Sequence, residues 1–389
     1  MVKKALAAIA LGLLCAAMPA QAQDSLTGAM DGAFEYSSSD FAGETPDTPP
    51  PLDSDEAFEE DTGIIYGGWL QGGWHSRDAS SGPGLSRFNT HPHRWNTHQA
   101  WLFAEKVADG RDGLDWGFRV DALYGVDGAD TQAFGNSAGR WDFDNGFDHG
   151  QFAFAIPQAY IELASGNWSF KAGHFFSLVG YEFVAAPDNF FYSHSFTMYN
   201  SEPFTHSGVL GTYNASDSLT LYGGWTSGWN TAFDTFNGGE SFLGGASLAL
   251  SETTIATYMA TGGNFGRRGE GYGHSIVLDT QVSDNFNYVI QGDYLDTDGD
   301  SPLAALDPLL NDTQYGINQY FLYTLSENVA AGIRYEWWNV SGISVNDITL
   351  GFNLKLRDNL VIRPEIRHDW APGLDYSDCL LYTSPSPRD

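Results

Sequence analysis

The stretch LDWGFRVDALYG at residues 114–125 decides the fold. Apolar side chains project to one side of an extended chain here and charged ones to the other, namely Leu114, Trp116, Phe118, Val120, Ala122 and Tyr124 against Asp115, Arg119 and Asp121. The same alternation recurs at residues 286–294 and 347–356. Period-two alternation in segments of about ten residues is typical of transmembrane β-strands.

Fifteen such segments are predicted, and the connections between them are unequal. The segments lie at residues 63–75, 96–106, 114–125, 151–163, 168–174, 207–213, 218–226, 241–250, 253–262, 272–282, 286–296, 313–325, 329–338, 347–356 and 360–370. Short Ser, Asn, Asp and Gly turns alternate with connections of about 8 to over 30 residues. A soluble β-sandwich also alternates along its strands. Short connections at one end of the strands and long ones at the other end, however, are typical of outer-membrane barrels.

An even, closed barrel needs one strand more than the fifteen predicted. We therefore expect an all-β fold, a transmembrane antiparallel up-and-down β-barrel with 16 strands in the intact protein and about 15 present here.

The composition excludes several other classes of protein. The 389 residues include 18 Lys+Arg against 49 Asp+Glu, and the formal net charge of −31 repels nucleic acid. With 15% aromatic residues and a mean hydropathy of −0.27, the chain is too aromatic for a disordered acidic protein and too polar for a helical membrane protein. Aromatic residues recur near the predicted strand ends, as in interfacial girdles: Tyr66, Trp74, Trp116, Tyr124, Trp168, Trp225, Tyr294, Trp337 and Trp338.

The two ends of the chain differ from its middle. Residues 1–22 carry two lysines, an apolar run and an Ala-Gln-Ala motif, so we expect a signal peptide cleaved before Gln23. Residues 23–62 contain twelve acidic residues and no basic one, which predicts a disordered acidic arm. Residues 379–389 read CLLYTSPSPRD and resemble a translated sequencing adapter, so we expect a non-native tail and a barrel at 63–378 without its last strand. Both cysteines lie in these ends, and the mature barrel is expected to carry no disulfide.

Four motifs link the chain to a known family. They are YGVDG at 124–128, YSHS at 192–195, EPFTHSG at 202–208 and RPEIRHDW at 363–370. In this order the chain resembles, over about residues 63–370, the β-barrel porin family of outer-membrane proteins of the planctomycete, legionella and proteobacterial type. The resemblance implies an outer-membrane channel and carries no catalytic residues.

The longest connection, residues 174–206, is the third outward loop. Likeness to 16-stranded porins implies that it folds into the barrel and sets the narrowest point. The expected pore lining is Glu182, Asp188, His194, Glu202 and His206 in the loop, with Arg119, Asp121, Glu162, Lys171, Arg334, Glu336, Arg363, Glu365 and Arg367 on the strands. One interpretation opposes the arginines to loop carboxylates across a water-filled gap, and the other joins these charges in local ion pairs that brace the wall.

Signals for enzymatic or metal chemistry are weak. His91, His93 and His98 lie close together, but Pro92 and the lack of nearby carboxylates argue against a metal site. Neighbouring Ser and His residues at 193–195 and 206–207 point to opposite sides of an extended chain. The aspartates at 296–300 lack the acidic residue that completes a calcium loop. We therefore predict no enzymatic activity, no metal and no other cofactor.

Two classes of function remain. The first is an outer-membrane porin, a channel for passive diffusion of small polar solutes and ions, with a cation preference from its acidic composition. The alternative is a plugged barrel with a binding or structural role at the surface, or a substrate-specific sugar channel, which an aromatic track along one wall would favour. The expected partners are outer-membrane lipid, lipopolysaccharide, the solutes and further copies in a homotrimer. The expected location is the outer membrane of a Gram-negative bacterium, reached through the cleaved signal peptide.

Overall fold

The computed structural model describes residues 63–76, 88–133, 140–235, 237–298, 313–372 and 376–387, the last range through its backbone. The predicted signal peptide at 1–22 and the acidic arm at 23–62 lie outside the described residues. Within the described ranges no helix has the length and apolar composition needed to span a bilayer.

The described chain forms one antiparallel sheet with three short helical turns beside it. The strands are β1 (Ile65–His75), β2 (Trp95–Lys106), β3 (Asp115–Gly125), β4 (Ala153–Ala155), β5 (Ala159–Ser165), β6 (Trp168–Phe176), β7 (Thr205–Ser216), β8 (Leu219–Thr226), β9 (Glu240–Ser251), β10 (Thr254–Asn264), β11 (Glu270–Ser283), β12 (Phe286–Thr297), β13 (Gln314–Ser326), β14 (Val329–Val340), β15 (Ile343–Arg357), β16 (Leu360–Ala371) and β17 (Tyr376–Pro387). The helical turns are α3 (Gly128–Thr131), η2 (Ala186–Asp188) and α4 (Phe196–Ser201). Sixteen of these strands are seven residues or longer, and β4 is a three-residue piece.

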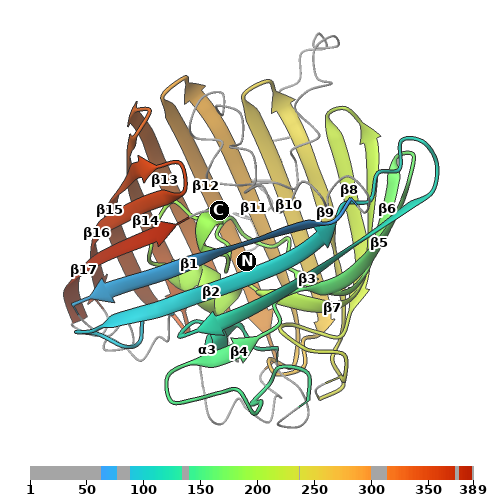
Figure 1. Cartoon of the computed structure of the whole chain (residues 1–389), viewed down its shortest axis with the longest axis horizontal. Coiled ribbons are helices and arrows are strands. Elements are labelled where there is room, and N and C mark those ends of the chain that lie inside the picture. Colours follow the sequence, from blue (N-terminus) through green and yellow to red (C-terminus); the bar gives the residue numbers. More distant parts are fainter. Residues whose placement is uncertain are drawn as a thin grey trace.

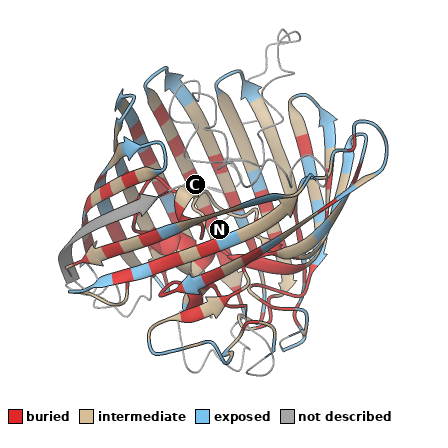
Figure 2. Cartoon of the chain, viewed as in Figure 1, coloured by how far each residue is buried: buried red, intermediate tan, exposed pale blue. Residues whose placement is uncertain are grey.

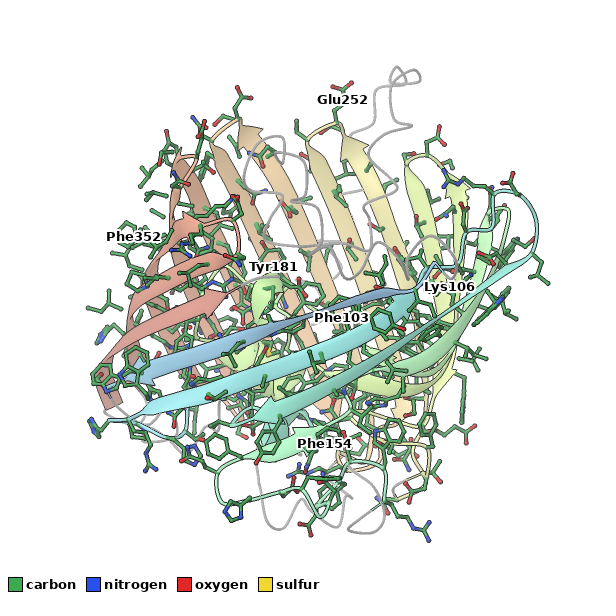
Figure 3. All side chains as sticks on the ribbon, in the orientation of Figure 1. Phe103, Lys106, Phe154, Tyr181, Glu252 and Phe352 are labelled. Carbon is green, nitrogen blue, oxygen red and sulfur yellow. The ribbon has the colours of Figure 1, made fainter. Side chains whose placement is uncertain are left out.

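Consecutive strands pair in the order of the chain, which curls the sheet into a barrel (Figure 1). β17 returns to β1, where the ladder is limited to Trp74 opposite Thr383 and His75 opposite Tyr382. Tight turns join strands at one rim, where Figure 3 shows Glu252, and the longer connections join them at the opposite rim, where it shows Phe154. The predicted difference between the rims is confirmed for most connections, but residues 265–269 and 341–342 form short turns at the rim of the longer connections.

Each of the fifteen predicted segments coincides with a strand, with two local differences. The segment at 151–163 is split into β4 and β5 because Pro157 has no N–H to donate to a ladder. The connection expected at 339–346 is a two-residue hairpin, since Ser341 and Gly342 both adopt positive φ angles, 53° and 81°, as a type I′ turn requires. The strands β14 and β15 are therefore longer than predicted.

The expectation that this chain lacks its sixteenth strand is corrected by the structure. β17 pairs with β16 along its whole length, from Ala371 opposite Tyr376 to Leu360 opposite Pro387. An unpaired β16 would expose a row of backbone N–H and C=O groups, and the following segment satisfies them. That residues 379–389 are a non-native tail stays a prediction.

Burial alternates along many strands (Figure 2), and the two faces of the barrel wall differ in chemistry, as the period-two pattern predicted. On β15, Ile348 and Leu350 are 44% and 40% exposed on the outer face, whereas Asp347 and Thr349 are fully buried on the inner face. An apolar outer face with polar groups inside is the arrangement that a bilayer requires.

Most of the aromatic residues predicted for the girdles lie on the outer face. Tyr66, Trp116 and Trp168 are 65%, 54% and 49% exposed there. Trp338 is the exception, because its ring is fully buried on the inner face and stacks on Phe196 at 6.0 Å between centroids. Its assignment to a girdle was wrong, and it belongs to the interior.

A charge on the outer face of β15 is expected to destabilise the protein. Leu350→Arg should lower the free energy of unfolding in lipid vesicles by about 2–4 kcal/mol, because the guanidinium would meet hydrocarbon. Urea titration of the refolded variant measures the change, with Leu350→Ala as control. Equal unfolding midpoints for the two variants would show that this face does not contact lipid.

Candidate functional site

The connection between β6 and β7 runs along the inner face of the barrel. It includes η2 and α4, and Figure 1 shows α4 within the curve of the sheet. Hydrogen bonds join it to inward side chains of β2, β12, β13, β14 and β16. Residues 177–204 are called the inner loop below. Its position agrees with the inward fold that the sequence led us to expect.

Carboxylates of the wall accept the backbone N–H groups of the inner loop. Glu365 on β16 accepts from the N–H of Tyr192 at 3.0 Å and from that of Ser193 at 3.3 Å. Glu336 on β14 accepts from the N–H groups of Phe196 and Thr197, each at 2.7 Å. These contacts satisfy donors that would otherwise be buried without partners.

Guanidinium groups of the wall donate to the backbone C=O groups of the same loop. Arg334 donates to the carbonyl oxygen of Ser193 at 2.7 Å. Arg367 donates to the carbonyl of His194 and Arg363 to that of Ala186, at 2.5 and 2.7 Å. Alternating acids and bases on β14 and β16 therefore bind the backbone of the loop, with Glu336 at the N-terminus of α4 and the other groups at residues 186–194.

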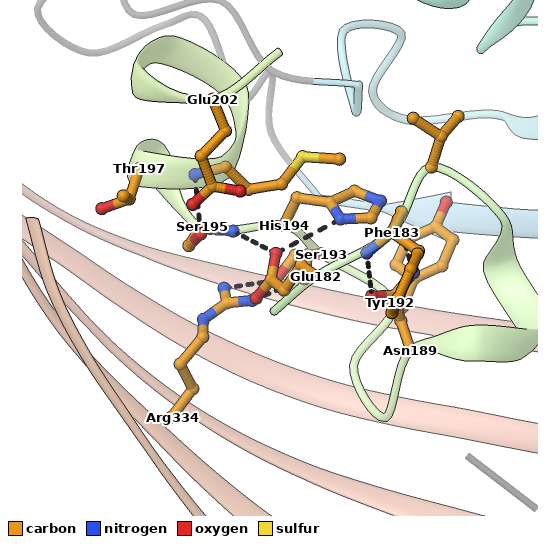
Figure 4. Close-up of polar contacts among 12 residues, drawn as sticks. Glu182, Phe183, Asn189, Tyr192, Ser193, His194, Ser195, Thr197, Glu202 and Arg334 are labelled. Atoms are coloured by element: carbon orange, nitrogen blue, oxygen red, sulfur yellow. Dashed lines mark hydrogen bonds and ion pairs between the residues drawn. The ribbon is translucent and has the colours of Figure 1, made fainter. Parts of the chain in front are cut away.

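Glu182 is the centre of the polar contacts within the loop (Figure 4). Its carboxylate accepts from Arg334 at 2.8 Å, from the backbone N–H of Ser195 at 2.8 Å and from the Tyr320 hydroxyl at 3.1 Å. The Nδ1 atom of His194 lies 3.3 Å from the same carboxylate. Burial alone would raise the pKa of Glu182, but the Arg334 guanidinium and the His194 imidazole outweigh it and lower the pKa to about 2.

The arginines below the loop share buried acids with one another. Asp347 lies 3.4 Å from Arg334 and 3.1 Å from Arg367, and Asp369 lies 2.6 Å from Arg367. All four side chains are fully buried. Removing one member of such a network leaves an uncompensated buried charge, which costs about 3–5 kcal/mol.

Glycines on the inner face make room for the loop. A Cβ atom at Gly332 would lie 2.4 Å from the Phe190 ring, and one at Gly351 would lie 3.0 Å from the Phe191 ring. Gly73 and Gly316 stand in the same relation to Tyr192 and Thr197, at 2.3 and 2.6 Å. The inner face therefore complements the loop in shape, through these glycines, as well as in charge.

A second anchor ties the loop to β2. Gln99 donates to the carbonyl of Val184 at 2.8 Å and accepts from the N–H of Ala186 at 3.0 Å. The Tyr192 hydroxyl lies 2.5 Å from His98, whose other ring nitrogen lies 2.9 Å from Asp127. The loop therefore follows the inner wall from β12 through β16 to β2.

Two of the predicted lining arginines are ion-paired in different ways. Arg334 reaches Glu182 directly at 2.8 Å, so these two charges form an ion pair rather than face each other across water. Arg119 pairs with Glu105 at 3.0 Å and with Asp121 at 2.8 Å, on its own part of the wall.

The remaining predicted residues lie in different surroundings. Asp188 belongs to η2 and is partly exposed. Glu202 accepts from Gln291 at 2.5 Å and is buried. Glu162 and Lys171 lie opposite each other on β5 and β6, and both are partly exposed.

Serine and histidine residues pair across strands rather than along the chain. His206 donates through Nδ1 to the carbonyl of Gly228 at 3.0 Å, which leaves Nε2 to accept from the Ser177 hydroxyl at 3.1 Å. His174 lies 2.8 Å from the Ser207 hydroxyl. The neighbouring pairs at 193–195 and 206–207 are thus not the contacts that form.

The described ranges bring no three His, Cys, Asp or Glu side chains together as ligands of a metal ion. His98 bonds Tyr192 and Asp127 instead of approaching His91 and His93 as a ligand set. Asp296 accepts from the hydroxyls of Tyr272, Tyr294 and Thr313 at 3.1–3.2 Å. Asp300 of the candidate calcium loop lies outside the described residues.

Sequence reasoning missed part of the anchor. The alternation along β15 places Asp347 on the inner face together with Thr349. It does not show that Arg334 and Arg367 are the partners of Asp347. The glycines opposite the loop rings could not have been found, because the strand pattern does not identify which glycine faces a loop aromatic.

Loss of the Glu182 charge is expected to release the inner loop. Because the folded pKa is lowered, this stabilisation is present above the ordinary value of 4.5 and is lost as pH falls from there towards about 2. Glu182→Gln should mimic the low-pH state and remove the pH dependence. Hydrogen exchange of the amides at 182–197, measured between pH 6 and 3, tests this. Glu240→Gln at the exposed start of β9 is the control, and equal exchange in both variants would contradict the prediction.

An added side chain at Gly332 is expected to displace the loop ring above it. Gly332→Ala should lower the free energy of unfolding by about 1–3 kcal/mol, because its Cβ would overlap Phe190. Urea titration in lipid vesicles gives the value. Gly223→Ala is the control, since nothing lies within 4 Å of a Cβ there, and an equally stable Gly332→Ala variant would rule out tight docking.

Comparison with known proteins agrees with this architecture. The family described as "Putative beta-barrel porin-2, OmpL-like" matches residues 63–378. No curated protein matches the chain significantly. The chain is similar in structure to the anion-selective porin from Comamonas acidovorans, with a TM-score of 0.56 and 10% identity, covering 84% of this chain and 99% of that one. It is also similar to OmpT of Vibrio cholerae in its trimer form, with a TM-score of 0.52, 10% identity and coverage of 84% and 99%.

These likenesses in fold rest on architecture, because an identity of 10% carries no residue roles. The family match covers 316 of the 389 residues, 378 − 62, and includes the strands from β1 to β16 and the inner loop. The chain belongs to the OmpL-like β-barrel porin family.

Proposed function

We propose that the protein is an outer-membrane porin that lets small polar solutes and ions diffuse through its barrel past the inner loop. The observation that carries the proposal is the uneven distribution of the loop's polar contacts. Most of its hydrogen bonds to strand side chains lie on β12–β16 and β2. On the facing wall Leu178 and Val179 reach an apolar cluster, and side chains such as Tyr160, Lys171 and Tyr222 stay partly exposed. Barrels of 16 strands are wide enough for an aqueous channel.

The constriction lies between the inner loop and the wall from β3 to β8. The arginines at 334, 363 and 367 are 0–1% exposed, so they fix the loop and contribute little field to the passage. The charges that a solute meets there are Glu105, Arg119, Glu162 and Lys171, which are partly exposed and balance to zero. A weak cation preference is expected from the acidity of the whole chain, with 49 acidic against 18 basic residues.

A plugged barrel is the second candidate function, and one observation favours it. The loop binds β2 as well as β12–β16, and apolar clusters such as that around Phe190, Tyr320 and Val289 fill the space beneath it. A barrel filled in this way would present its long loops as a binding surface. Conductance separates the two candidates.

Assembly and targeting complete the proposal. A homotrimer is proposed because the structurally similar OmpT of Vibrio cholerae is described in a trimer form. Residues 1–22 are proposed to direct export and to be removed, and residues 23–62 to form an acidic arm ahead of the barrel.

Single-channel recording in a planar bilayer tests the porin function. The refolded chain should give stepwise conductance, and a salt gradient should give a small reversal potential of the sign for cation preference. Glu182→Gln should increase current fluctuations, because it weakens the seat of the loop. A folded barrel that gives no current, alone or with this substitution, would establish the plugged form instead.

A further inference from the structure

The inner face of the wall at β5, β6 and β8 combines aromatic rings with an acid and a base that take no part in holding the inner loop. It consists of Tyr160 and Glu162 on β5, Lys171 on β6 and Tyr222 on β8, and it is called the tyrosine wall here. All four side chains are inward-facing and partly exposed. The inner loop adds the partly exposed Leu178 and Val179, which pack with the two tyrosines on one apolar cluster.

Lys171 and Glu162 differ from the other charges of the interior. They are direct cross-strand neighbours in the β5–β6 ladder. In the part of the chain that the structure describes, neither side chain is within ion-pair or hydrogen-bond distance of a partner, although each lies in the electrostatic field of the other. The Lys171 ammonium lies over the Tyr160 ring instead, 4.2 Å from its centroid.

Other charged side chains of the interior differ from Lys171 and Glu162 in having close ion-pair partners. Arg119, one strand away, is paired twice, with Glu105 and Asp121. Arg334 and Glu182 bind each other and the loop backbone. One acid and one base thus remain available side by side, within a wall of ring faces and aliphatic groups.

We infer that the tyrosine wall binds small zwitterionic solutes of the amino-acid class as they pass. The inference rests on the proposed channel and names its substrate class. The carboxylate of the solute takes the free donors of Lys171, its ammonium group takes Glu162, and an apolar side chain lies against Tyr222, Leu178 and Val179.

The pair of charges is what selects the zwitterion. A simple anion would meet Glu162 beside Lys171, and a simple cation would meet Lys171 beside Glu162, so each loses by repulsion what it gains by attraction. A solute that carries both charges gains from both groups. Its apolar side chain adds contact with a wall that is mainly apolar apart from these few polar groups.

Three solutes of one skeleton test the inference. L-phenylalanine carries both charges, 3-phenylpropionate lacks the ammonium group and 2-phenylethylamine lacks the carboxylate. In single-channel recordings, the concentration of L-phenylalanine that halves the open-channel current should be about tenfold lower than for either analogue, the effect of one additional charge-assisted contact. Sucrose serves as the neutral solute and should block weakly.

Two substitutions assign each charge to its group. Lys171→Gln should remove the preference of L-phenylalanine over 2-phenylethylamine, and Glu162→Gln should remove its preference over 3-phenylpropionate. The double variant Glu162→Lys with Lys171→Glu should again bind L-phenylalanine, with its carboxylate and ammonium group in exchanged positions. Lys355→Gln on β15 is the matched control, since that lysine pairs with Asp358 at 3.2 Å and lies away from the tyrosine wall.

The outcomes distinguish this inference from the channel itself. A conducting barrel that is blocked equally by all three aromatic solutes, or best by sucrose, would overturn the zwitterion site and leave the porin in place. A barrel that gives no current while titration calorimetry detects L-phenylalanine binding, lost in both single variants, would overturn the channel and keep the site. Equal effects of Lys355→Gln and Lys171→Gln would also overturn the assignment.

Discussion

A lipid bilayer provides no water to satisfy backbone N–H and C=O groups, and the rest of this structure depends on that constraint. Each strand must pair on both edges, so the chain continues from β1 to β17 and returns towards β1. The outer face must then be apolar and the inner face carries the polar groups, which gives the period-two pattern along every strand.

The inner loop obeys the same constraint without being part of the sheet. Its N–H groups reach Glu365 and Glu336, and its C=O groups reach Arg334, Arg363 and Arg367. Side chains of the wall thereby replace the neighbouring strand that the loop lacks. Many of the buried interior charges serve this purpose, so in the proposed channel the permeation path would be lined by less buried groups.

Strands could be predicted from the sequence because a lipid-facing wall permits few departures from alternation. The fifteen predicted segments coincide with strands, and the misplaced limits have local causes in Pro157 and in the turn at Ser341 and Gly342. The absence of a sixteenth strand was predicted from the altered composition after residue 378, and β17 shows that backbone pairing does not depend on that composition. The sequence opposed the wall arginines to the loop carboxylates as two groups, but it could not show which arginine contacts which carboxylate, since Glu182 and Arg334 are 152 residues apart and no spacing rule joins them. Parity identifies which residues face inward, and it leaves their partners undetermined.

The position of the inner loop in the chain has a consequence for the order of assembly. Residues 177–204 are synthesised before β12–β16, yet most of their anchoring groups lie on those later strands. With only the strands up to β7 in place, the loop would be held mainly by β2, through Gln99 and His98. The loop reaches its final position only when Glu336, Arg367 and Glu365 arrive on β14 and β16. The position of the loop thus depends on strands that follow it in the chain, and a barrel without β14 and β16 would hold it only loosely.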